Sequence, residues 1–117
     1  MELVRVGSDS QPETRMRLYL VRGGLPEPVL NHVVTSVYGS PALWPDAAYP
    51  VQRVAVQYEG SHHNAADQYL RDIRRADIAA ERGWLEVRVS KFDLAGDRPA
   101  VVGKVRAALQ SRGWRAR

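Results

Sequence analysis

The stretch RVAVQYE (residues 53–59) decides the fold of this 117-residue chain, because it is the clearest strand in the sequence. Val54, Val56 and Tyr58 alternate with smaller or more polar residues, and a period of two is typical of a strand with one apolar face. Two shorter β-rich stretches precede it, at residues 29–38 and 43–49, with turn residues between them. We therefore expect three consecutive antiparallel strands, of which residues 53–59 form the last.

A helix is expected on the N-terminal side of these strands, at residues 11–22. Ser10 and Glu13 have the spacing of a capping box at its start, and Gly23-Gly24 ends the pattern. Its apolar spacing predicts one face turned toward the protein interior. The residues expected on that face are Met16, Leu20 and Val21.

Two further helices and a fourth strand are expected after residue 60. Residues 66–82 predict a helix with a buried stripe made of Tyr69, Ile73, Ala76 and Ala80. Residues 85–90 alternate like a strand, and residues 99–111 predict a last helix. The order α-β-β-β-α-β-α predicts the α/β (α+β) class, with a small mixed sheet flanked by helices.

The composition excludes several classes of protein. The chain has no cysteine, so a disulfide framework, a thiolate zinc site and a cysteine nucleophile are ruled out. It has no run of about 20 apolar residues and no visible secretory signal, so we expect a cytoplasmic protein without a membrane partner. We interpret residues 1–10 as a lead-in or linker, residues 11–112 as one domain and residues 113–117 as a basic tail.

Charge is divided unevenly along the chain. Residues 1–60 hold five arginines and six acidic residues, whereas residues 61–117 hold twelve basic and seven acidic residues. A basic half favours an anionic partner, for which nucleic acid is the usual candidate. The plainer interpretation is a solvated helix face on a mildly basic protein.

Four polar side chains gather around the third strand of the expected fold. Asp46 ends the second β-rich stretch, and Gln57 and Glu59 point to one face of the third strand. Glu13 belongs to the first helix, which must pack against the sheet. Oxygen ligands from neighbouring elements are what Mg²⁺ requires, and the ion can hold a phosphate and activate a water. Plainer roles are a turn residue for Asp46, a solvated strand-end acid for Glu59 and a capping-box partner for Glu13.

The order of elements and five stretches of sequence resemble the PD-(D/E)XK nuclease superfamily, and more closely its very-short-patch-repair-like endonuclease domains of actinobacteria. The stretches are QPETRMRL (11–18), PDAAYP (45–50), RVAVQYEGSHH (53–63), YLRDIRR (69–75) and RGWLEVRVS (82–90). The resemblance implies a restriction-endonuclease-like core and a DNA endonuclease that hydrolyses phosphodiester bonds with Mg²⁺ or Mn²⁺. It also implies that an N-terminal partner domain can precede such a domain in a longer protein.

The resemblance assigns roles to individual residues. Asp46 and Glu59 would be the metal ligands. Gln57 takes the position where relatives usually carry an acid, and Glu13 would match an acid of the first helix. One of the adjacent histidines, His62 or His63, would lie beside the scissile phosphate as a general base or a phosphate contact.

Four arginines are the candidates for holding the DNA backbone. Arg71, Arg74 and Arg75 lie on the helix that flanks the substrate groove in this superfamily, and Arg88 lies on the fourth strand. The arginine fork matches phosphate oxygens. Pairing within the helix, such as Asp67 with Arg71, is the alternative use of these charges.

The third-strand motif departs from the superfamily. It reads Gln-x-Glu in place of the usual Glu-x-Lys, and the only lysines, Lys91 and Lys104, lie outside it. This departure favours a second hypothesis, a weakened or inactive nuclease-fold domain that binds nucleic acid in a regulatory or toxin–antitoxin context. A third hypothesis is a protein-interaction domain on the same scaffold.

Overall fold

The computed structural model describes residues 11–35, 39, 41–59 and 65–116, and it has the mixed α and β composition expected from the sequence. Its elements are α1 (Gln11–Arg22), β1 (Val34–Thr35), β2 (Pro41–Leu43), β3 (Ala47–Tyr49), β4 (Val54–Tyr58), α2 (Ala65–Glu81), β5 (Leu85–Val89), the 3₁₀-helix η1 (Lys91–Leu94) and α3 (Ala100–Ser111). Among the described residues, no helix combines the length and apolar character that spanning a membrane would need.

The strand predicted at residues 53–59 becomes β4, the centre of a three-stranded mixed sheet with the order β3-β4-β5. β3 runs antiparallel to β4, with Ala47 opposite Val56, and β5 runs parallel to it, with Val87 opposite the same residue. A parallel neighbour requires a long crossover connection, and α2 supplies it. β1 and β2 form a separate antiparallel pair, joined to β3 by a bridge between Val29 and Ala48.

The expectation of three simple consecutive strands is wrong in detail. Within its described part, the stretch 29–38 forms only the two residues of β1. The stretch 43–49 is divided between β2 and β3 by Trp44, Pro45 and Asp46. Pro45 has no N–H to donate to a ladder and it restricts the residue before it, so the chain changes direction there.

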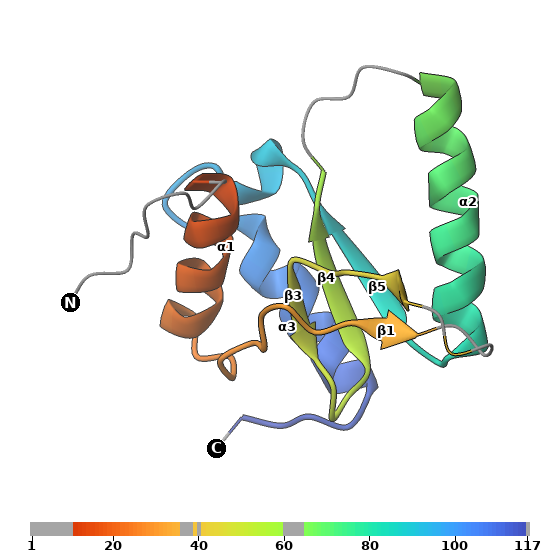
Figure 1. Ribbon diagram of the computed structural model, residues 1–117. Helices are drawn as coiled ribbons and strands as arrows, with labels where there is room; N and C mark the ends of the chain where they lie inside the picture. The colour runs from red at the N-terminus through yellow and green to blue at the C-terminus, as the bar shows by residue number, and fades with distance from the viewer. Residues whose placement is uncertain (1–10, 36–38, 40, 60–64, 117) are drawn as a thin grey trace.

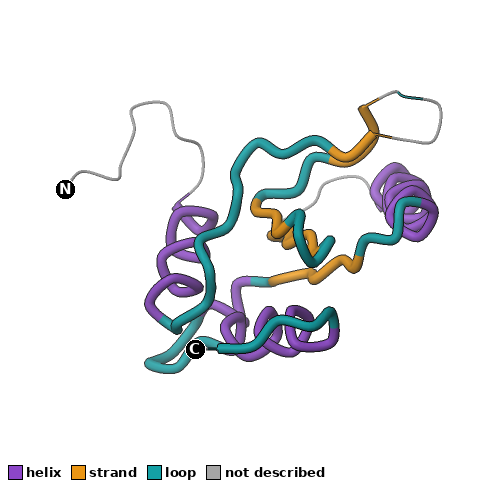
Figure 2. Tube along the Cα trace, turned by 90° about the horizontal axis from the view of Figure 1, so that it is seen from below, coloured by secondary structure: helices purple, strands orange, loops and turns teal. Residues whose placement is uncertain are grey.

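The helices form two layers on opposite faces of the sheet. α1 and α3 lie on one face and α2 lies on the other, as Figures 1 and 2 show from perpendicular directions. The main core lies on the α1–α3 side and includes the fully buried Met16, Leu20, Val54, Val56, Val89, Val101, Val105 and Leu109. A smaller cluster on the α2 side contains Val34, Leu43, Ala55 and Ala79, with Trp84 against it. The apolar burial that stabilises the fold is therefore concentrated on one face.

The expected end of α1 is confirmed, and it has a specific geometry. Gly24 has φ +88° and donates to the carbonyl of Val21, while Leu25 donates to the carbonyl of Leu20. These are the two bonds of a Schellman motif, which favours glycine at the left-handed position. Val21 itself is 43% exposed, so its predicted inward orientation is wrong. Ser10, the expected cap at the other end, lies outside the described residues.

The predicted buried stripe of α2 is wrong, although the helix itself is confirmed. Tyr69 is 66% exposed and Ile73 is 44% exposed, and Ala76 and Ala80 are exposed as well. Ala79 is buried instead. The helix is therefore rotated relative to the expected orientation, with its most apolar side away from the sheet.

Gly23 provides a test of how tightly α1 meets α3. A Cβ added at Gly23 would lie 2.6 Å from Cγ1 of Val102, a stiff β-branched side chain. We expect Gly23→Ala to lower the free energy of unfolding by about 1–3 kcal/mol through this overlap. Urea denaturation monitored by circular dichroism measures the change.

Gly103→Ala is the matched control. A Cβ at Gly103 meets nothing within 4 Å, and the residue lies inside α3. We expect it to raise the free energy of unfolding by up to about 1 kcal/mol, because alanine is the better helix former. Equal behaviour of the two variants would contradict the close α1–α3 contact.

Candidate functional site

Asp46 is held against the central strand. It lies between β2 and β3, directly before Ala47, and its Oδ2 accepts a hydrogen bond of 2.8 Å from the backbone N–H of Tyr58. The main chain of β3 ends its pairing with β4 at Ala47. The Asp46 carboxylate therefore continues the ladder by replacing a backbone acceptor, and it is fixed at the C-terminal end of β4.

Gln57 and Glu59, the chain neighbours of Tyr58 at this end of β4, face α2. Alternate residues of a strand share one face, and Ala55 packs in the small cluster with Ala79 of α2. Gln57 and Glu59 therefore follow Ala55 on the same face, and both are half-buried. The N–H of Glu59 donates to the carbonyl of Val89 at 2.7 Å, which extends the pairing with β5 beyond the last residue of β4.

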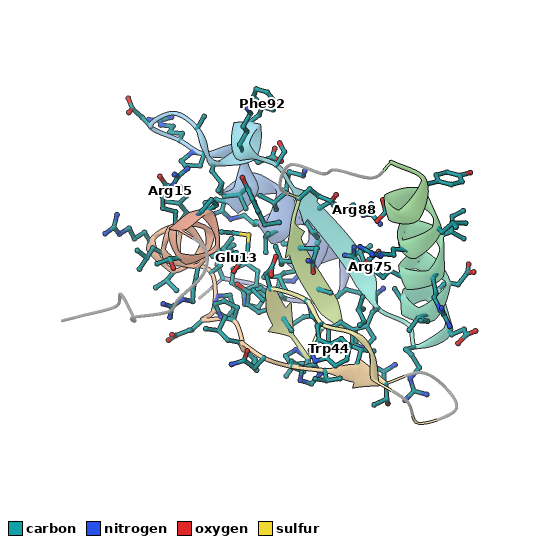
Figure 3. The ribbon with its side chains drawn as sticks, turned by 45° about the horizontal axis from the view of Figure 1, so that its top comes forward. Glu13, Arg15, Trp44, Arg75, Arg88 and Phe92 are labelled. Carbon is teal, nitrogen blue, oxygen red and sulfur yellow. The ribbon has the colours of Figure 1, made fainter. Side chains whose placement is uncertain are left out.

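A network of ion pairs lies between this face and α2. We call it the charge cluster, and its members are Glu59, Asp72, Arg75, Glu86 and Arg88. Arg88 lies 3.2 Å from Asp72 and 3.7 Å from each of Glu59 and Glu86. Arg75 lies 3.4 Å from Glu86 and 3.5 Å from Asp72. Figure 3 shows Arg75 and Arg88 between α2 and the sheet.

Three carboxylates surround two guanidinium groups in the charge cluster, so its formal charge is −1. Partial burial opposes the charge of Arg88, but its hydrogen bond to Asp72 and the nearby Asp72, Glu59 and Glu86 outweigh this effect and raise its pKa. Arg88 is therefore a permanent counter-ion at the end of β4 and β5.

The charge cluster explains the orientation of α2. The face of the sheet beneath the helix presents Glu86 and Arg88 next to Gln57. An apolar stripe laid over these groups would bury them and would remove the partners that Asp72 and Arg75 provide. The helix instead turns Asp72 and Arg75 toward the sheet, and its apolar stripe faces outward.

Three of the remaining predicted site residues are described by the structure, and none of them belongs to the charge cluster. Glu13 is half-buried in the first turn of α1, in the layer on the other face of the sheet (Figure 3). Arg71 and Arg74 are on α2, but both are exposed and neither belongs to the charge cluster. His62 and His63 lie outside the described residues. The structure therefore groups Asp46, Gln57 and Glu59 with Arg75 and Arg88.

Two members of the charge cluster, Asp72 and Glu86, were not among the residues predicted from the sequence. Each of them nevertheless follows a pattern that the sequence contains. Glu86 alternates with Arg88 on one face of β5, and Asp72 is three residues before Arg75 on α2. Each pattern indicates an arginine with a local acidic partner.

Among the described residues, the donors placed at the end of β4 are the carboxylates of Asp46 and Glu59 and the amide of Gln57. Across the described part of the chain, no three His, Cys, Asp or Glu side chains converge as a metal-binding group. Comparisons with protein-family models, with curated proteins and with solved structures find no match to this chain. What this site can do must therefore be inferred from its chemistry.

Two substitutions at Asp46 separate the effect of its hydrogen bond on stability from the effect of its charge. We expect Asp46→Ala to lower the free energy of unfolding by about 1–3 kcal/mol, because it leaves the Tyr58 N–H without its acceptor. Asp46→Asn should cost less, since an amide oxygen can still accept this bond. Chemical denaturation at neutral pH measures both variants, and an equal loss in both would show that the bond contributes nothing.

The charge cluster predicts a salt-dependent effect at Arg88. We expect Arg88→Met to lower the free energy of unfolding by roughly 1 kcal/mol at low ionic strength, the upper range for partly exposed ion pairs. The loss should shrink at high salt, because dissolved ions screen the attraction between Arg88 and its acidic neighbours. Denaturation curves at low and at high salt measure it. Arg82→Met, at an exposed position outside the cluster, is the control.

Proposed function

We propose that this protein is a metal-dependent DNA endonuclease of the PD-(D/E)XK type. The observation that carries the proposal is the 2.8 Å hydrogen bond from the Tyr58 N–H to Asp46. It fixes a carboxylate at the end of the central strand, where Gln57 and Glu59 lie on either side of Tyr58. In the superfamily that the sequence resembles, these positions would carry the catalytic motif.

The donor chemistry fits Mg²⁺ or Mn²⁺. Mg²⁺ keeps several waters and is usually held by one or two carboxylates together with substrate phosphates. Asp46 and Glu59 are the residues that would hold it, with the amide oxygen of Gln57 as a neutral neighbour. When bound, such an ion polarises a phosphate and lowers the pKa of a water that it carries.

The arginines near the proposed site have two different roles, binding of the substrate and positioning of the site. Arg71 and Arg74 are exposed on α2 and available to backbone phosphates, which arginine binds in a bidentate manner. Arg75 and Arg88 are engaged with acids, so we assign them to positioning Glu59 and α2. The roles of Glu13, His62 and His63 rest on the resemblance alone.

One observation favours a second candidate, a domain of this fold that binds nucleic acid without cutting it. Arg88 lies 3.7 Å from Glu59 and neutralises part of the charge that a metal ion would need. Gln57 contributes no charge in the position where relatives carry an acid. In a regulatory or toxin–antitoxin protein, the same surface would hold the nucleic acid backbone and leave it intact.

Nicking of supercoiled plasmid distinguishes the two candidates. We expect cleavage with Mg²⁺ or Mn²⁺ that stops in EDTA. We also expect Asp46→Asn and Glu59→Gln to lower the rate by about 100-fold or more, on the order of losing one essential electrostatic group. The asparagine variant removes charge but keeps an acceptor for Tyr58, so a loss of activity is not a loss of folding.

Glu27→Gln is the matched control, because Glu27 is an exposed acid in the segment after α1. Its cleavage rate should equal that of the unchanged protein. If Asp46→Asn cleaves as fast as this control, the site assignment is wrong. If the unchanged protein binds plasmid in a salt-sensitive manner but never cuts it, the binding-only candidate is correct.

A further inference from the structure

A basic surface lies on the α1–α3 side of the protein, and Figure 2 shows this side across the sheet from α2. It contains two hollows. The first, of about 580 Å³, is lined by Tyr19 and Arg22 of α1 and by residues 97–100. The second, of about 500 Å³, is lined by residues 24–26 and by Trp114 and Arg115. Gly23 and Arg106 line both hollows, so the two are adjacent. We call them together the α1–α3 groove.

The charge of the α1–α3 groove is strongly positive. Its charged lining residues are Arg22, Arg98, Arg106 and Arg115, together with one acid, Asp97. Among the ion pairs between described residues, none involves these four arginines. The arginines of the charge cluster are surrounded by carboxylates, so the two surfaces differ in kind. Four arginines outside the ion pairs of the described residues therefore lie together in the groove, where they can act jointly on an anionic partner.

Arg106 is held in place between the two hollows. Its Nη2 donates a hydrogen bond of 2.7 Å to the carbonyl of Gly23, at the end of α1. The side chain is half-buried, whereas Arg22, Arg98 and Arg115 are exposed. A guanidinium group that is already oriented loses less conformational freedom when it binds a phosphate.

Each hollow also contains an aromatic side chain. Tyr19 lines the first hollow and Trp114 lines the second, and both pack against the main core. Their positions are thereby restrained, and part of each side chain remains accessible because both are half-buried. Aromatic side chains interleaved with arginines are the features that hold single-stranded nucleic acid, by stacking on bases and contacting phosphates.

We propose that the α1–α3 groove binds a segment of single-stranded nucleic acid, with bases in the two hollows and phosphates on Arg22, Arg98, Arg106 and Arg115. Each hollow has a volume suited to a small ligand unit such as one nucleotide. A base must leave its stack to enter a hollow, so a single strand fits this surface and an intact duplex does not. The proposal is independent of cleavage at Asp46.

Fluorescence anisotropy with a labelled oligothymidylate and a duplex of equal length tests the proposal on the full chain. We expect the single strand to bind more tightly than the duplex. The double variant Arg22→Glu with Arg98→Glu should weaken single-strand binding by at least about tenfold. It should also lower the slope of log K against log salt by about 1.4, the loss of two phosphate contacts.

The matched control is Arg82→Glu with Lys91→Glu, an equal charge change at two exposed positions outside the groove. The proposal is overturned if the two double variants bind the single strand equally tightly. It is also overturned if the duplex, or inorganic polyphosphate of equal charge, binds the unchanged protein as tightly as the single strand does.

Trp114→Phe provides a second readout, since it keeps an aromatic group for the core. Oligothymidylate should quench tryptophan fluorescence in the unchanged protein, and quenching should fall in this variant.

Because the groove and the proposed cleavage site use different residues, their failures are distinguishable. Loss of nicking in Asp46→Asn with unchanged single-strand binding would separate the two surfaces and support both proposals. Loss of single-strand binding in Asp46→Asn would assign that binding to the β4 site and overturn the groove.

Discussion

The pairing of β4 on both of its edges is the constraint on which the rest of the structure depends. β3 binds one edge in antiparallel register and β5 binds the other in parallel register, so every residue of β4 has a fixed face. Val54 and Val56 must then enter the core beneath α1 and α3, while Gln57 and Glu59 must face α2. A shift of one residue would exchange the two faces and bury charge in the apolar core. The candidate site is therefore a consequence of the same register that builds the core.

The polar face of β4 has a further consequence for the layer above it. An amphipathic helix usually places its most apolar side against the sheet, but α2 places Asp72 and Arg75 there. The ion pairs satisfy the charges of β5, and among the described side chains of α2 (residues 69–81) Ala79 alone is buried, in the small apolar cluster. Tyr69 and Ile73 are left exposed as a result. Compensation of charge thus determines the orientation of this helix, because unpaired buried charge costs more than exposed apolar surface.

Two groups of arginines have different environments. Arg75 and Arg88, between α2 and the sheet, are close to carboxylates and act within the protein, as the three acidic neighbours of Arg88 show. The two hollows of the α1–α3 groove have only one acid in their lining, and the arginines of the groove are Arg22, Arg98, Arg106 and Arg115. The same residue type therefore stabilises a layer in one place and provides a surface for an anion in the other. Net charge alone could not separate these uses, because it does not record which charges are neighbours.

The sequence by itself determined the elements of this protein but not how all of their faces meet. The alternation at residues 53–59, the glycines after Arg22 and the expected last helix depend on local periodicity and backbone preference, and the structure agrees with them. Asp46 and Glu59 could be selected because of their places beside the central strand. Only the tertiary contacts established the rotation of α2 and the membership of Asp72 and Glu86 in the charge cluster. These features depend on pairs of residues far apart in the chain, and local periodicity carries no information about which distant charge a side chain will meet.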